Sequence, residues 1–92
     1  QIYANTNTIP DNNSFLVVVG SDGSVEAAEP ELKWARDSVS KTAEVYQKGK
    51  WYITAIPVNT SYEDSKILAE KVKSISNGKR QAYIISSKNI VN

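Results

Sequence analysis

A pattern of strand, turn, capped helix and strand occurs twice in this chain, and the second copy follows the first at a distance of 37 positions. At this offset the matching positions are Val17 and Thr54, Val19 and Ile56, Ser24 and Ser61, Val25 and Tyr62, and Ala35 and Val72. Two such halves predict the order β-α-β-β-α-β. Because crossover connections are right-handed, we expect both helices on one face of a four-stranded antiparallel sheet, with the first and third strands in its centre. The predicted fold is therefore an α+β sandwich of two layers.

The elements of this pattern begin and end at recognisable signals. Hydrophobic periodicity and turn residues predict strands at 15–19, 43–47, 50–56 and 81–85 and helices at 24–40 and 61–76. Ser24 and Ser61 are expected to cap the two helices. Pro30 is expected to kink the first helix, and Asn77-Gly78 to end the second one. Residues 1–13 are interpreted as a polar linker or arm, 14–86 as the domain, and 87–92 as a fraying polar C-terminal tail.

The segment from Ala43 to Ile56 predicts a tight β-hairpin. Lys48-Gly49 separates two runs of β-branched and aromatic residues, and glycine supplies the positive φ that a two-residue turn needs. With these two residues in the turn, Tyr46 lies opposite Trp51, and directly opposed aromatic pairs stabilise a sheet. The same register fixes which side chains share a face, because strand residues alternate between the two faces.

One face of the predicted sheet is covered by the helices, and the other has no cover within the domain. The residues expected toward the helices are Phe15, Val17, Val19, Val45, Tyr52, Thr54, Ile56, Ala82 and Ile84. The uncovered face is expected to carry Leu16, Val18, Glu44, Tyr46, Trp51, Ile53, Tyr83 and Ile85. A contiguous apolar and aromatic surface of this kind is typical of a ligand or partner site. The alternative is that the N-terminal arm, a neighbouring domain or a second copy of the chain covers it.

Composition argues against several classes of function. The chain has no histidine and no cysteine, so it lacks the usual ligands of zinc, copper and haem and the groups of histidine- and thiol-assisted catalysis. No carboxylate pair is spaced for acid–base work, and we therefore expect no enzyme, no cofactor and no metal. The net charge of +1 argues against nucleic acid, and no apolar run is long enough for membrane insertion. No leader is recognisable, so we expect a mature segment or an excised domain.

Charged residues outside the predicted core are interpreted as solvated, with an anion site as the alternative for the basic ones. This interpretation covers the acidic residues around the first helix and the basic residues of two turns: Asp22, Glu26, Glu29, Glu31 and Asp37, and Lys48, Lys50, Lys79 and Arg80. Trp34 points off the apolar stripe of its helix and is interpreted as a partly buried residue at the helix edge.

Short motifs in both halves resemble the SPOR domain. They are Val17-Val18-Val19-Gly20-Ser21, Ala28 in the first helix, Trp51-Tyr52 and Ala82-Tyr83-Ile84, within a likeness that spans Ser14 to about Ser86. The segment from Glu31 to Tyr52 is similar to a bacterial SPOR-like subgroup. The resemblance implies the ferredoxin-like β-α-β-β-α-β fold and a soluble domain of the bacterial periplasm or cell envelope. It also implies binding of peptidoglycan glycan strands that lack stem peptides, on the helix-free face, with contacts from Leu16, Val18, Tyr46, Trp51, Ile53 and Tyr83.

Three classes of function follow from the uncovered face. The first is a non-catalytic module that binds glycan strands, since Tyr and Trp offer flat faces with polar edges for stacking on sugar rings. The second is a protein–protein interaction module that uses the same apolar face or an edge strand, with a weak homodimer as one form of it. The third is a small-molecule regulatory domain or a divergent RNA binder, although the sequence shows neither a basic surface nor a base-stacking motif.

Overall fold

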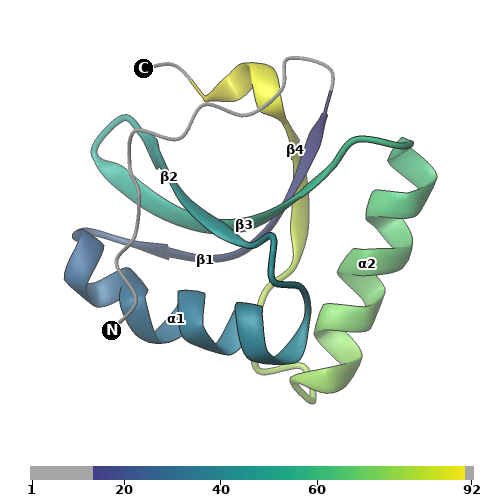
Figure 1. Cartoon of the computed structure of the whole chain (residues 1–92), viewed down its shortest axis with the longest axis horizontal. Coiled ribbons are helices and arrows are strands. Elements are labelled where there is room, and N and C mark those ends of the chain that lie inside the picture. The colour runs from purple at the N-terminus through teal and green to yellow at the C-terminus, as the bar shows by residue number, and fades with distance from the viewer. Residues whose placement is uncertain (1–13, 91–92) are drawn as a thin grey trace.

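A four-stranded antiparallel sheet with two helices on one side forms the body of the protein (Figure 1). The computed structural model describes residues 14–90. Its elements are β1 (Phe15–Asp22), α1 (Val25–Ser38), β2 (Glu44–Lys48), β3 (Trp51–Val58), α2 (Tyr62–Ile75), β4 (Tyr83–Ser86) and the 3₁₀ helix η1 (Ser87–Asn89). The sheet order is β2-β3-β1-β4, with β1 and β3 central. The predicted β-α-β-β-α-β sandwich, with its ferredoxin-like strand order, is confirmed.

The helix boundaries follow the capping signals in the sequence. Ser24 Oγ accepts a hydrogen bond from the backbone N–H of Ala27, and Ser61 Oγ accepts one from Asp64, as expected of N-cap serines. After α2 the chain takes positive φ angles at Asn77 (55°) and Gly78 (74°). The N–H of Gly78 donates to the carbonyl of Lys73 at 2.8 Å, which satisfies one of the last carbonyls of the helix. The predicted ends of α2 are thus confirmed.

The hairpin between β2 and β3 has a different register from the predicted one. Lys48 pairs with Trp51 and Tyr46 with Ile53, so the turn residues are Gly49 and Lys50, and the predicted Tyr46–Trp51 pair is wrong. Gly49 has a φ of 61°, and Lys50 is not among the described residues with a positive φ. A type II′ turn needs a positive φ only at its first central residue, whereas Lys48-Gly49 as a type I′ turn would need it at Lys48 too. The register moved by two residues, so every side chain keeps its predicted face.

Strand β1 contains a bulge that the sequence prediction did not include. Val18 pairs with Ala55, but the next pair along the two strands joins Gly20 to Thr54, which leaves Val19 as the extra residue. Gly20 faces α1 at this point. A Cβ atom on Gly20 would collide with the carboxylate of Glu31, so the absence of a side chain lets α1 bring this carboxylate against the strand.

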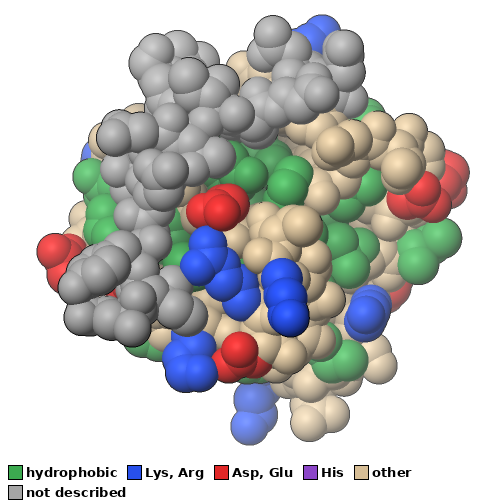
Figure 2. Space-filling view, in the orientation of Figure 1, with side chains coloured by type: hydrophobic (Ala, Val, Ile, Leu, Met, Phe, Trp, Pro, Cys, Tyr) green, Lys and Arg blue, Asp and Glu red, His purple; other side chains and the backbone are tan. Residues whose placement is uncertain are grey.

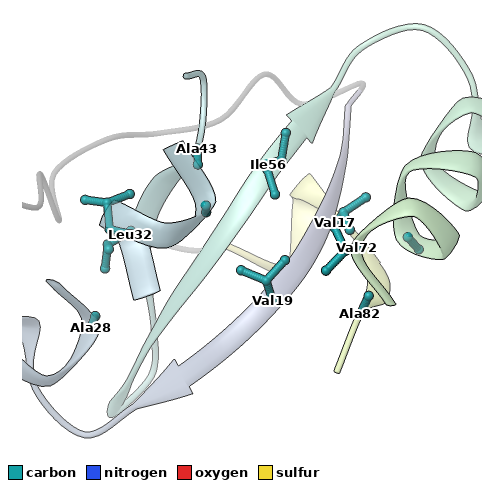
Figure 3. Packing of buried hydrophobic residues seen from close by; sticks show 11 residues of the cluster. Val17, Val19, Ala28, Leu32, Ala43, Ile56, Val72 and Ala82 are labelled. Atoms are coloured by element: carbon teal, nitrogen blue, oxygen red, sulfur yellow. The ribbon is translucent and has the colours of Figure 1, made fainter. Parts of the chain in front are cut away.

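The main core lies between the sheet and the two helices. Figure 3 shows side chains from β1 and β3 between those from α1 and α2. The buried cluster consists of Val17, Val19, Ala28, Leu32, Ala35, Ala43, Val45, Ile56, Ala69, Val72 and Ala82. The predicted helix-facing residues Tyr52 and Ile84 pack against this cluster as partly buried side chains. The face predicted to contact the helices is therefore confirmed.

The opposite face of the sheet is packed as well, in contrast to the predicted open surface. Leu16, Val18, Tyr46, Ile53 and Ala55 are all buried and form a second cluster. Ile90 belongs to this cluster as a buried residue, and Ile85 packs against it. Figure 1 shows η1, in yellow, on the side of the sheet away from the two helices.

The segment after β4 is ordered by these contacts, and the prediction of a fraying tail is wrong for residues 87–90. Ser87 is buried, and its backbone N–H donates to the carbonyl of Ser14 at 3.0 Å. Ser86 Oγ accepts from the N–H of Lys88 and caps η1. The η1 turn brings the apolar side chain of Ile90 back onto the sheet. The polar residues around Ile90 gave no indication of this packing in the sequence. The predicted N-terminal arm, residues 1–13, lies outside the described residues.

Candidate functional site

The six residues predicted to bind a ligand all lie on the helix-free side of the sheet, but they differ sharply in exposure. The four buried ones are Leu16, Val18, Tyr46 and Ile53. Trp51, two residues before Ile53 on β3, is 48% exposed, and Tyr83, which pairs with Val18, is 45% exposed. In this structure the two exposed rings are the members of the predicted set with substantial surface for a ligand.

The four buried side chains lie on the same face of the sheet as the two rings and form a packed cluster beside them. Tyr46 is only 2% exposed, and burial, followed by the negative charge of Glu44, raises the pKa of its hydroxyl to about 12. The hydroxyl therefore stays protonated at any physiological pH. Sequence alternation placed these residues on the correct face, but it could not show that Ile90 would return to pack against them.

Trp51 lies at the hairpin end of the sheet, beside basic residues. Lys48 is its partner across the hairpin, and the ammonium of Lys50 lies 5.8 Å from the centre of the indole ring. Tyr83 begins β4, on the far side of β1. Ala55 of β3 is level with Val18 and hence with Tyr83, so Trp51 lies four residues further along the sheet. Strand spacings place the Cα positions of the two residues about 16 Å apart, which suits an extended ligand rather than one small ring.

A cavity of about 710 Å³ lies where the end of β1, α1 and the loop between α2 and β4 meet. Its lining includes Ser21, Glu31, Trp34, Lys79, Arg80 and Tyr83. The guanidinium carbon of Arg80 lies 4.3 Å from the ring centre of Trp34, within the range of a cation–π contact. Arg80 Nη1 is 3.6 Å from Glu31 Oε1, a charge contact longer than a hydrogen bond.

Glu31 has an unusual environment for a residue predicted to be solvated. Its side chain is 24% exposed, and its Oε2 atom and Asp22 Oδ2 are both buried with no hydrogen-bond donor among the described residues while the two carboxylates are ionised. Burial, hydrogen bonding to the Asp22 side chain and the charge of Asp22 raise the pKa of Glu31 to about 7, against a smaller opposing effect of Arg80. Two carboxylates can share a hydrogen bond only when one carries a proton, so this bond forms as Glu31 becomes protonated on lowering the pH through about 7.

Sequence reasoning missed the Asp22–Glu31 pair because the two residues are nine positions apart in different elements. The available signal was Gly20 inside an apolar strand, since a glycine there often marks a bulge or a close approach of another group. The prediction that Trp34 is partly buried is confirmed.

Figure 2 shows Lys and Arg side chains interspersed with acidic and hydrophobic ones on the face in view, rather than a continuous basic surface.

Residues 14–90 contain neither a cluster of metal-ligating side chains nor a membrane-spanning helix. That part of the chain contains no group of three or more histidine, cysteine, aspartate or glutamate residues arranged to hold a metal ion. Neither of its two 14-residue helices is long and apolar enough to cross a membrane.

Comparison with known proteins adds no relative to this description. The chain gives no significant match to a family model, to a curated protein or to a solved structure. Its class is therefore defined by the fold alone, an α+β sandwich of ferredoxin-like topology. The resemblance to the SPOR domain stays a prediction, and function has to be argued from the surface.

Proposed function

We propose that this chain is a non-catalytic binding module of the bacterial periplasm or cell envelope that recognises peptidoglycan glycan strands. The ligand would contact the helix-free side of the sheet through Trp51 and Tyr83. The observation that carries this proposal is the pair of half-exposed aromatic rings on one side of a single sheet. Flat rings with polar edges stack on sugar rings, and positions about 16 Å apart suit two non-adjacent sugars of one extended strand.

The other residues of the predicted site have a supporting role in this proposal. Leu16, Val18, Tyr46 and Ile53 form a packed layer that fixes the strands below the rings. A ring on a rigid strand loses less conformational entropy on binding than one on a mobile loop. Lys48 and Lys50 are exposed next to Trp51 and can donate hydrogen bonds to sugar hydroxyls.

Retention of the purified chain on amidase-treated bacterial sacculi tests this proposal. We expect Trp51→Ala and Tyr83→Ala each to weaken retention by about tenfold, the effect of losing roughly 1–2 kcal/mol of stacking. Tyr62→Ala is the matched control, because Tyr62 is an aromatic residue of similar exposure, 49%, on α2. Thermal unfolding of each variant separates loss of contact from loss of fold. Equal retention of all three variants would exclude the two rings as the contact.

A second candidate function is a protein–protein interaction module that uses the same face or an edge strand. The observation that favours it is the packing of Ile90, part of a polypeptide segment, against the apolar cluster of this face. Because the cluster is already buried, a partner segment would contact this face beside Ile90, through the exposed rings of Trp51 and Tyr83. Light scattering and crosslinking distinguish the two candidates, since a homodimer whose contact includes Trp51 favours the interaction module, whereas a monomer retained on sacculi favours the glycan module.

A further inference from the structure

The cavity beside α1 has no part in the proposed glycan contact, apart from the edge it shares with Tyr83. Its volume of about 710 Å³ lies within the range of small-molecule sites. It is formed mainly by the end of β1, by Glu31 and Trp34 of α1 and by the loop that follows α2, with Ile75 and Tyr83 at the two ends of this loop. The kind of ligand that it can bind depends on the protonation and hydrogen bonding of its charged side chains.

Arg80 is held in place without using the hydrogen-bonding capacity of its guanidinium group. The group stacks on Trp34, and the backbone N–H of Arg80 donates to Ser76 Oγ at 3.3 Å. Its contact with Glu31 is 3.6 Å long, and within residues 14–90 no hydrogen bond of the guanidinium is found. A guanidinium carries five N–H donors in a planar fork that matches an oxyanion. The donors of Arg80 are therefore available to a ligand.

The charged side chains around Arg80 come from β1, from α1 and from the loop between α2 and β4. Lys79 from the α2–β4 loop is the second cation, Glu31 from α1 is the nearest acid, and Asp22 from β1 lies against Glu31. Because Gly20 has no side chain, the Glu31 carboxyl group can lie against β1, where it can donate a hydrogen bond to Asp22 when it is protonated. In that state Asp22 carries the one negative charge of the pair, and Arg80 and Lys79 leave the cavity with a net positive charge.

We propose that this cavity binds a small oxyanion, a carboxylate or a phosphate-like group, through the guanidinium of Arg80 stacked on Trp34 and the ammonium of Lys79. The rise in the pKa of Glu31 to about 7 adds a pH dependence, because an ionised Glu31 competes with the ligand for Arg80. Binding then strengthens as the pH falls through neutrality.

Calorimetric titration of the whole chain with benzoate and with inorganic sulfate tests this inference, since neither probe changes its charge between pH 6 and pH 8. We expect the apparent Kd of the wild-type chain to be about tenfold weaker at pH 8, because the protonated share of Glu31 falls from about nine-tenths to about one-tenth. Tighter binding of benzoate assigns the site to carboxylates, and tighter binding of sulfate assigns it to phosphate-like groups.

Three variants separate a specific site from a general charge effect. Arg80→Gln should abolish binding, whereas Lys71→Gln, which removes the same charge from an exposed position on α2, should change the Kd by less than about twofold. Glu31→Gln should bind equally at both pH values, with the affinity that the wild-type chain has at pH 6. Equal losses in Arg80→Gln and Lys71→Gln would overturn the proposal, as would a lack of binding by folded Glu31→Gln. Neither result depends on whether the chain binds glycan strands.

Discussion

Replacing Glu31 by glutamine should remove most of the pH dependence of stability between pH 5 and pH 8. In the folded chain the pKa of Glu31 is raised from 4.5 to about 7. The folded state therefore holds a proton that the unfolded state releases, and this contribution to stability is complete below about pH 4.5 and is lost as the pH rises through about 7. Glutamine keeps the uncharged form, and its amide N–H can donate to Asp22 at every pH.

The size of the effect follows from the same two pKa values. The difference between 4.5 and about 7 corresponds to about 3 kcal/mol, at roughly 1.4 kcal/mol for each pKa unit. Because 24% of the Glu31 side chain still contacts water, screening reduces the expected effect to about 1–2 kcal/mol. The chain has no histidine and no cysteine, so few other side chains are expected to titrate in this range.

Urea unfolding followed by tryptophan fluorescence at pH 5 and pH 8 measures this effect. The wild-type chain should lose about 1–2 kcal/mol on going to pH 8, while Glu31→Gln should keep its stability and exceed the wild type there. Glu70→Gln is the matched control, because its carboxylate is 76% exposed on α2, and its profile should run parallel to the wild type. The reasoning is refuted if Glu31→Gln and the wild type differ by the same amount at both pH values.

Two further predictions concern the packing that the sequence did not reveal. Tyr46→Ala should lower the free energy of unfolding by about 3–5 kcal/mol, because Tyr46 is buried. Tyr83→Ala on the same face should change it by less than about 1 kcal/mol, because Tyr83 is about half exposed. Chemical denaturation measures both values, and equal effects would contradict the packed second cluster. Gly20→Ala should destabilise the fold, because its Cβ would displace the Glu31 carboxylate from the strand. Gly23→Ala is the control, since its Cβ would meet no atom within 4 Å, and a harmless Gly20→Ala would show that Glu31 is not held there.

The sequence by itself determined the elements of this protein, their order and the face on which each side chain lies. These are local properties: Ser24 and Ser61 cap helices through bonds to residues three positions on, and Gly78 takes the positive φ that ends α2. The alternation of apolar residues in β1 and β3 assigned the side chains of the two clusters to the correct faces, although the predicted hairpin register was wrong. The observed register differs from the predicted one by two residues, and because side chains alternate with a period of two, their faces do not change.

Only the tertiary structure shows which of the predicted surface residues are exposed to solvent. Ile90 covers part of the helix-free face, and its short polar segment has no periodicity from which this docking could be read. The fold also brings together Asp22 of β1, Glu31 of α1 and Arg80 of the α2–β4 loop, and the burial of Glu31 and its contact with Asp22 raise its pKa against the opposing charge of Arg80. Burial and charge coupling depend on distances between residues remote in the chain. Residue type and spacing therefore indicate where a side chain points, but not what lies against it.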